Sequence, residues 1–263
     1  MNYRDILYGV ADGIARITLN KPEKLNALSW GTWAEIESAF EAAGADDAVR
    51  CVLLTGAGRG FSAGTDLTVG EEAAPERPYR GRVGAMRSRY LATATVYDCR
   101  KPTVAAVNGA CVGAGFSLAL ACDIRIASEA ARFSAIFAKR GISADTGATW
   151  FLPRMIGMER ALEMLYTGRI VGAEEALKVG IVSEVVAADH LMTRAEALAR
   201  EIAHGPTLAI EVMKRLARDG LRRDLAEHIE AEQFLQAVTT GSEDAREGRL
   251  SFLEKRDPQF KGR

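Results

Sequence analysis

The fold is decided by residues 103–127, which read TVAAVNGACVGAGFSLALACDIRIA. Thr103–Val107 predicts a strand, Asn108-Gly109 predicts a turn, and Ala114–Ala121 predicts a helix. Asp123–Ala127 then predicts a second strand. A strand, a glycine-rich turn, a helix and another strand in this order are typical of an α/β fold.

The flanking sequence continues the α/β pattern toward the N-terminus and becomes helical toward the C-terminus. Strands are predicted at Ile6–Val10, Ile14–Leu19 and Val49–Leu54, with a helix that begins after Ser29. Residues 71–89 are rich in Pro, Gly, Glu and Arg, and predict a surface loop. Beyond Pro153 one short strand is predicted near Ser183–Val186, and helices are predicted at Met155–Tyr166, Ala173–Val179, Leu191–Ala203, Thr207–Arg218 and Leu221–Val238. The apolar stripes of these helices suggest an oligomer interface.

Composition excludes several classes of protein. The 263 residues carry a formal net charge of −1, so we expect neither nucleic acid nor a membrane surface as a partner. The chain has no signal-like N-terminus and no apolar run near the roughly 18 residues of a membrane span, so we expect a cytoplasmic protein. The four cysteines lack a CxxC pair and are predicted to be buried thiols. The three histidines form no ligand pair on a helix face, so no metal site is expected.

Two glycine-rich stretches, Gly56–Leu67 and Asn108–Gly115, each follow a predicted strand. Neither has the G-x-G-x-x-G pattern with a following acid, or the Gly-Lys-Ser/Thr of a phosphate-binding loop. Gly60–Gly64 does match the G-x-S-x-G pattern of serine hydrolases. However, the preceding strand ends several residues earlier and no amphipathic helix follows, so we interpret Ser62 as structural and keep a serine hydrolase as an alternative.

Several motifs together resemble one family. They are Asn20–Leu28 (NKPEKLNAL), Gly60–Leu67 (GFSAGTDL), Ala106–Ile124, Thr167-Gly168, Ala173–Glu184, and Glu247-Gly248-Arg249 to Lys255-Arg256. In this order they resemble the crotonase (enoyl-CoA hydratase/isomerase) superfamily over essentially the whole chain. The resemblance implies an α/β, crotonase-like (ClpP/crotonase) spiral of ββα units at residues 1–203 with the acyl-CoA site. It also implies a helical trimerisation region at residues 204–263, and a homotrimer or dimer of trimers. The only cofactor-like group is the CoA of the acyl-CoA thioester substrate.

The resemblance also implies an oxyanion hole. In this family two backbone N–H groups hold the thioester oxygen, and the matching residues are Thr65 and Ala114. Preorganised N–H donors at the start of a helix suit a developing enolate charge. The alternative interpretation is that these glycine-rich stretches only make tight turns.

The chain departs from the hydratase pattern at both catalytic glutamates, where Ser117 and Phe137 stand. Asp145 lies in a segment that resembles single-Asp enoyl-CoA isomerases of the phenylacetate-pathway type, and the resemblance implies that it shuttles a proton. We expect Phe137, Trp150 and Tyr90 to desolvate it and raise its pKa. The alternatives are that Asp145 caps a short helix at Thr146–Trp150, and that the aromatic residues are plain core. Dehalogenases of this superfamily also have an aspartate at this position, together with a Trp and a His. This chain has Phe137 and Tyr90 in place of that Trp and His, so dehalogenation is not favoured.

The predicted activity is therefore a double-bond shift in an enoyl-CoA with Asp145 as proton shuttle. The alternatives are hydration with Asp145 activating water, serine hydrolysis through Ser62, and a non-catalytic acyl-CoA-binding protein. The residues that the resemblance assigns to substrate binding are Lys24, Ala27, Ala63, Asp66, Leu67, Gly113, Phe137, Trp150, Phe252 and Lys255. Of these, Phe252 and Lys255 are expected to reach the CoA nucleotide of a neighbouring subunit.

Overall fold

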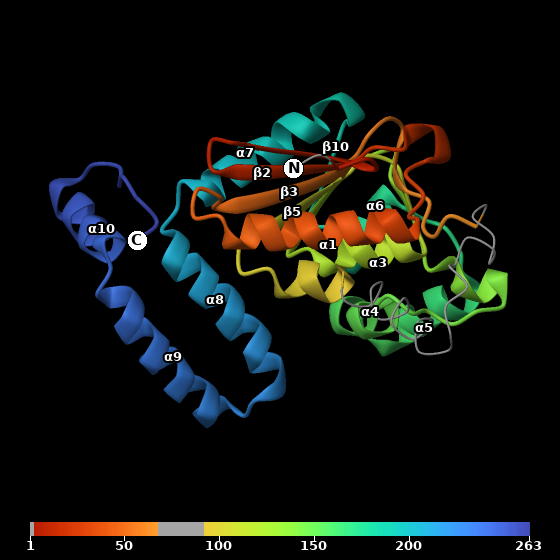
Figure 1. The fold of residues 1–263 in the computed structure, drawn as a ribbon. Coiled ribbons are helices and arrows are strands. Elements are labelled where there is room, and N and C mark those ends of the chain that lie inside the picture. The colour runs from red at the N-terminus through yellow and green to blue at the C-terminus, as the bar shows by residue number, and fades with distance from the viewer. Residues whose placement is uncertain (1–2, 68–91) are drawn as a thin grey trace, which may run out of the picture.

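The computed structural model describes residues 3–67 and 92–263. The predicted loop at 71–89 and Tyr90 lie outside the described residues. A six-stranded sheet runs through the body of the molecule (Figure 1), with the strand order β1-β2-β3-β5-β7-β10. β1 and β2 are antiparallel, and the other neighbours are parallel. The strands are β1 (Ile6–Ala11), β2 (Ile14–Leu19), β3 (Cys51–Gly56), β5 (Thr103–Val107), β7 (Ile124–Ser128) and β10 (Glu184–Val186). The expected α/β class and its main strands are thus confirmed.

A second sheet has the order β4-β6-β8-β9. Its strands are β4 (Gly60–Ser62), β6 (Ala110–Val112), β8 (Arg132–Ser134) and β9 (Val171–Gly172). They are two or three residues long, and such runs are too short to show an alternating pattern. This sheet was therefore missed by the sequence interpretation. It matters because β4 and β6 lead directly into the two glycine-rich turns.

Helices pack on both faces of the first sheet, and the last three extend away from it (Figure 1). They are α1 (Trp30–Ala45), α3 (Ala114–Ala121), α4 (Ala148–Ile156), α5 (Met158–Thr167), α6 (Ala173–Val179), α7 (Leu191–Ala203), α8 (Thr207–Asp219), α9 (Leu225–Thr240) and α10 (Glu243–Glu254), and residues 92–98 are also helical. Short 3₁₀ helices occur at η1 (Pro22–Lys24), η3 (Ile136–Arg140), η4 (Ala188–His190) and η5 (Gly220–Arg222).

Two predicted helix boundaries were wrong. The helix expected at Met155–Tyr166 is divided into α4 and α5 because Gly157 adopts a positive φ of 80°. The helix expected from Leu221 begins at Leu225, where the side chain of Asp224 accepts the N–H of Glu227. In both cases a local cap overrides an apolar pattern that continues across it.

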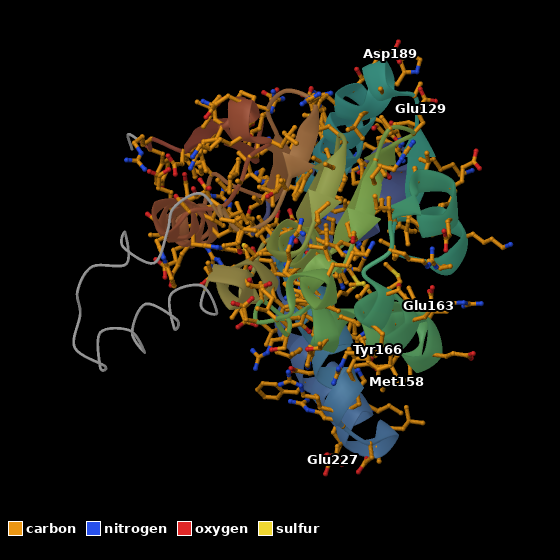
Figure 2. The ribbon with its side chains drawn as sticks, turned by 90° about the vertical axis from the view of Figure 1, so that its right-hand side faces the viewer. Glu129, Met158, Glu163, Tyr166, Asp189 and Glu227 are labelled. Atoms are coloured by element: carbon orange, nitrogen blue, oxygen red, sulfur yellow. The ribbon has the colours of Figure 1, made fainter. Side chains whose placement is uncertain are left out.

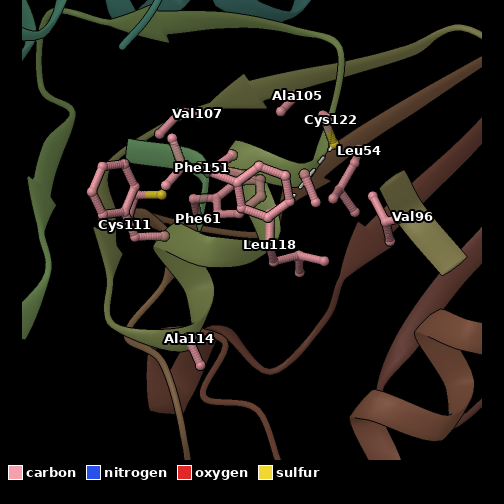
Figure 3. Close-up of a cluster of buried hydrophobic side chains, with 14 of the residues drawn as sticks. Leu54, Phe61, Val96, Ala105, Val107, Cys111, Ala114, Leu118, Cys122 and Phe151 are labelled. Atoms are coloured by element: carbon pink, nitrogen blue, oxygen red, sulfur yellow. Dashed lines mark hydrogen bonds between the residues drawn. The ribbon is translucent and has the colours of Figure 1, made fainter. Parts of the chain in front are cut away.

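The core lies on both faces of the large sheet. On one face the main cluster joins the sheet to α1, α3 and α4, and on the other a smaller cluster joins it to α7. Every residue of α3 is buried, which its small and apolar sequence AGFSLALA permits. Figure 3 shows Ala114 and Leu118 of α3 in the same cluster as Phe61 and Phe151. The four cysteines are free and buried, as expected, and burial raises the pKa of the Cys122 thiol to about 12.

The last three helices extend away from this body (Figure 1). α8 is tied to the core by ion pairs from Lys214 and Arg218 to Asp123, at 2.7 and 2.5 Å, and by a Lys101–Glu211 pair at 2.9 Å. No residue of α9 is buried. Among residues 3–67 and 92–263, no helix has both the length and the apolar character to cross a membrane.

Candidate active site

The first glycine-rich turn, residues 62–66, is held by a short parallel bridge to Leu28. The N–H of Leu28 donates to the carbonyl of Gly64 at 2.7 Å, and the N–H of Asp66 donates to the carbonyl of Leu28 at 3.1 Å. In a parallel bridge the middle residue directs its own N–H to the other side. The Thr65 N–H therefore points away from Leu28, and it donates to no acceptor within the described residues.

The second turn, residues 112–114, follows β6 and leads into α3. Gly113 precedes the helix with φ 56°, and its N–H donates to the carbonyl of Ser134 at 2.9 Å. Ala114 is the first residue of α3, so the helix itself provides no acceptor for its N–H. The positive end of the helix dipole adds to the field at this position.

The two turns are in direct contact at Gly64. A Cβ atom placed on Gly64 would lie 3.3 Å from the Ala114 nitrogen and 2.7 Å from the Val112 carbonyl oxygen. Gly64 also has a φ of 89°, which side chains rarely adopt. The close contacts and the positive φ each require a glycine at position 64. The structure thus places the turn that contains Thr65 directly against the turn that contains Ala114.

A buried asparagine organises the segment that supports the first turn. Asn26 donates from its side-chain amide to the carbonyls of Ala57 and Gly60 at 2.9 and 2.7 Å, and accepts the N–H of Lys21 at 2.9 Å. Leu25 and Asn26 both have positive φ, at 49° and 56°. Two consecutive non-glycine residues in this region indicate local strain that the surrounding bonds maintain. Asn26 falls within the quoted NKPEKLNAL motif, but the sequence alone indicated no role for it.

Ser62 has a structural role, as expected. It is fully buried, donates to the carbonyl of Asn26 at 2.8 Å and accepts the N–H of Gly64 at 3.2 Å. A Cβ on Gly115 would lie 2.5 Å from the Cβ of Ser62, so α3 packs closely against it. A nucleophilic serine needs access to substrate and a neighbouring base. Ser62 is sealed from substrate, which argues against the serine hydrolase alternative.

Asp145 lies on the loop between η3 and α4, and its side chain is exposed in the described chain. α4 begins at Ala148 with Gly147 as its N-cap, so the interpretation of Asp145 as a helix cap was wrong. The expected burial of its carboxylate by Phe137 and Trp150 is not seen, and Tyr90 lies outside the described residues. Phe137 is 6% exposed in the main core, and the Trp150 ring packs against Tyr97 at 5.2 Å and Phe151 at 5.0 Å. The Phe137 ring therefore packs in the core, and the Trp150 ring packs against two other aromatic rings.

The two positions that carry glutamates in hydratases hold no carboxylate. Ser117 is fully buried in α3 and donates to the carbonyl of Gly113 at 3.5 Å. Phe137 lies in η3, close to the second turn, where Ile136 approaches Gly113. Neither side chain can take a proton from carbon.

The predicted substrate contacts divide into three groups. Lys24 and Asp66 form an ion pair at 3.0 Å, with the Asp66 side chain only 2% exposed, and so join the η1 segment to the first turn. Ala63 and Leu67 are exposed beside them, whereas Ala27 and Gly113 are buried. Phe252 is exposed on α10 and Lys255 is exposed at its end, far from α3 in Figure 1. Within one chain the structure does not bring these last two residues to the turns.

Comparison with known proteins gives one consistent result. A family model described as enoyl-CoA hydratase/isomerase matches residues 9–263. The 1,2-epoxyphenylacetyl-CoA isomerase of Escherichia coli is 37% identical, with 98% of each chain covered. The crotonyl-CoA hydratase of Syntrophomonas wolfei is 34% identical, with 99% of each chain covered. The solved structure of an enoyl-CoA hydratase from Bacillus anthracis superposes with a TM-score of 0.92 at 32% identity, and covers 99% of this chain and 100% of its own.

Proposed function

Because this chain belongs to the enoyl-CoA hydratase/isomerase family, we propose that it holds the carbonyl oxygen of an acyl-CoA thioester between the N–H groups of Thr65 and Ala114. The support is the contact of the two turns at Gly64 and the place of Ala114 at the start of α3. Both donors belong to the backbone, so they lose no side-chain entropy when the oxygen becomes an enolate. Removal of one such donor typically costs about 3–4 kcal/mol of transition-state stabilisation.

The proposed reaction is a double-bond shift along the acyl chain, with Asp145 as the proton shuttle. The observation that carries it is the distribution of carboxylates over three positions: Asp145 carries one, whereas Ser117 and Phe137 stand where hydratases have paired glutamates. A syn-hydration by two glutamates needs one carboxylate for water and another for the α-carbon. An isomerisation moves one proton and needs one shuttle.

The steps balance without a further reactant. The Asp145 carboxylate removes a proton from C2 of a 3-enoyl thioester, and the electron pair forms a dienolate whose oxygen is held by Thr65 and Ala114. The protonated Asp145 then returns that proton to C4. The product is the conjugated 2-enoyl thioester, and Asp145 is again a carboxylate. Thr65 and Ala114 stabilise the charge and Asp145 moves the proton.

Hydration is the second candidate, because relatives such as the crotonyl-CoA hydratase are named for that reaction. In that case Asp145 activates a water molecule that adds to C3. Mass spectrometry distinguishes the two reactions, since hydration adds the mass of one water and isomerisation adds nothing. A non-catalytic acyl-CoA-binding protein would give neither product.

We propose that residues 1–203 form the acyl-CoA-binding core and that residues 204–263 assemble it as a homotrimer or a dimer of trimers. The support is apolar surface. Large exposed side chains on the C-terminal unit are Met213, Leu221, Leu225, Ile229, Phe234, Val238, Leu250, Phe252 and Leu253. Further exposed residues, Met158 and Tyr166, project from α5 (Figure 2). Exposed apolar area of this extent is typical of a protein interface. In such an assembly Phe252 and Lys255 would serve the site of a neighbouring copy.

The experiment that tests the reaction is Asp145→Asn, assayed with 3-enoyl and 2-enoyl thioesters. We expect turnover to fall by at least about 100-fold, because a positioned acid or base contributes about 10²–10⁴-fold. Binding of a saturated acyl-CoA and the unfolding temperature are expected to stay close to wild type. Asp189→Asn, an exposed aspartate before α7, is the matched control. An Asp145→Asn enzyme with unimpaired turnover would refute the assignment.

A further inference from the structure

β1 forms one edge of the six-stranded sheet, and within the described residues only β2 pairs with it. Proteins usually protect such an edge with charged side chains, a proline or a β-bulge. β1 reads ILYGVA, so it has neither a charge nor a proline, and its register with β2 runs without a bulge. Leu7 and Val10 are 55% and 41% exposed on it. An uncharged, regular edge of this kind is a template for pairing with another strand.

A groove of about 520 Å³ lies beside this edge, between the β1–β2 hairpin and α7. Leu7, Gly9 and Ala11 share one face of β1 and line the groove. The Arg16–Glu196 ion pair between β2 and α7 also lines it. A Cβ atom placed on Gly9 would have no atom of the described residues within 4 Å. The groove therefore has room for an apolar side chain next to Gly9.

The backbone bonds to β2 determine which groups of β1 remain open. Asn20 lies opposite Asp5 by continuation of the register, and its N–H donates to the Asp5 carbonyl at 2.9 Å. Hydrogen-bonded pairs occur at every second residue of an antiparallel ladder, so the odd-numbered residues of β1 bond to β2. The N–H and C=O groups of Ile6, Tyr8 and Val10 therefore point outward, and no described residue outside β2 bonds to them.

These outward groups restrict how a second copy of β1 can pair with the first. Two identical antiparallel strands are related by a two-fold axis, and their hydrogen-bonded pairs must use the outward groups of both copies. A register centred on Tyr8 places Tyr8 opposite Tyr8 of the second copy, and Ile6 opposite Val10 of the second copy. All three outward residues of each copy are then paired. A shift by one residue instead brings them opposite groups that already bond to β2.

The same register also matches the side chains. Leu7 comes opposite Gly9 of the second copy in a non-hydrogen-bonded pair, where side chains lie closest, so the exposed leucine enters the open space next to that glycine. Arg4 comes opposite Asp12 of the second copy, twice by symmetry. The Arg4 side chain is 81% exposed besides its bond to Asp5, and Asp12 is exposed. A shift by two residues loses both opposite-charge pairs.

We propose that β1 pairs with β1 of a second copy of this chain, antiparallel and centred on Tyr8, so that one sheet continues through both chains. The support is the uncharged edge, the self-complementary outward groups and the opposite charges at each end. The inference does not rest on the proposed reaction, and it uses no residue of 204–263. Where the helical region forms trimers, this contact joins chains of two different trimers.

The register is tested with single introduced cysteines, because the four native cysteines are free and buried. Only a residue on the two-fold axis meets its own copy, with Cα atoms about 5.5 Å apart, which a disulfide can span. We expect mild oxidation of Tyr8→Cys to give a cross-linked dimer on a denaturing gel. Val10→Cys is the matched control, because the two copies of position 10 lie four residues, or about 13 Å, apart along the strands. Val10 is also more exposed than the half-buried Tyr8, so random collision would favour the control.

The contact itself is tested with Val10→Pro. Because the Val10 N–H points outward, proline at this position removes no bond to β2, and edge strands tolerate such a proline. It removes one donor of each copy from the proposed pair and places its ring between the strands. We expect the mass measured by sedimentation velocity to fall to about half. Val10→Thr, which keeps the N–H and the branched shape, should keep the wild-type mass, and thermal unfolding checks that each variant is folded.

Absence of a cross-linked dimer in Tyr8→Cys, or an unchanged mass in folded Val10→Pro, overturns the proposal. Comparable cross-linking of Val10→Cys and Tyr8→Cys indicates random collision and also overturns it. The outcome is separable from that of the proposed function. Turnover that survives Asp145→Asn refutes the reaction and leaves the masses and cross-links as they are, whereas an unchanged mass in Val10→Pro leaves the role of Asp145 untouched.

Discussion

Replacement of Ala114 by proline removes one proposed oxyanion donor and places a ring atom at the site of the bound oxygen. Ala114 is the first residue of α3, where proline is well tolerated because its missing N–H has no helical partner. A proline restricts the residue before it by contacts with that residue's N–H and Cβ, and Gly113 has no Cβ. The substitution therefore deletes a hydrogen-bond donor and places the ring Cδ where the thioester oxygen would lie.

The expected cost follows from the donor that is lost. Loss of one oxyanion donor lowers kcat by about 10²–10³-fold, which is about 3–4 kcal/mol. Because the ring Cδ also takes the place of the oxygen, this is the minimum expected loss. The assay is the rate of the double-bond shift under saturating substrate, together with thermal unfolding. Met158→Pro is the matched control, because Met158 is also the first residue of a helix and also follows a glycine with positive φ, Gly157. A folded Ala114→Pro enzyme with kcat within tenfold of wild type would refute the two-amide model.

Two further predictions concern acid stability and assembly. Burial opposes ionisation of Asp5, but hydrogen bonds from Thr32, Arg4 and Ser29 outweigh it and lower the pKa to about 2. A carboxylate whose pKa is lowered on folding stabilises the fold at pH values above its ordinary pKa of 3.8. The free energy of unfolding should therefore fall by about 2 kcal/mol as the pH falls from about 4 to 2. Denaturant unfolding of the wild type and of Asp5→Asn measures this loss, and an equal loss in both proteins would contradict the prediction. Phe234 is 73% exposed on α9, and Phe234→Arg should reduce the mass of the assembly measured by sedimentation velocity. Gln233→Arg, at an exposed neighbour, should leave this mass unchanged. An unchanged mass for Phe234→Arg would exclude this face of α9 as the oligomer interface.

The long elements were predictable from the sequence because their patterns are local. The strand at Thr103–Val107, the helix at Ala114–Ala121 and the helix at Leu191–Ala203 all have the predicted bounds. The second sheet was not predictable, since its strands of two or three residues are defined by their partners. The pairing of Gly60 with Ala110 is an example: it joins residues far apart in the chain and leaves no periodic signal.

The candidate site shows the same division. The glycine-rich turns and their place after strands are visible in the sequence, and their contact in space is not. The side-chain packing around Asp145 could not be predicted in the same way: Phe137 enters the core, Trp150 packs against Tyr97 and Phe151, and Tyr90 lies outside the described residues. Closeness in sequence predicts which residues share a loop, but it does not predict which side chains share a packing partner.

The two parts of the proposed site, the first turn and the Asp145 loop, differ in how the structure holds them. The first turn is fixed by the backbone bonds to Leu28, by Ser62 and by the Lys24–Asp66 pair, so several independent contacts hold Thr65 in one orientation. Asp145 lies on the loop between η3 and α4, and its side chain is exposed. A backbone site of this kind can serve any reaction that passes through a thioester enolate. We therefore expect the choice among such reactions to depend on the side chains at positions 117, 137 and 145 rather than on the backbone of the two turns.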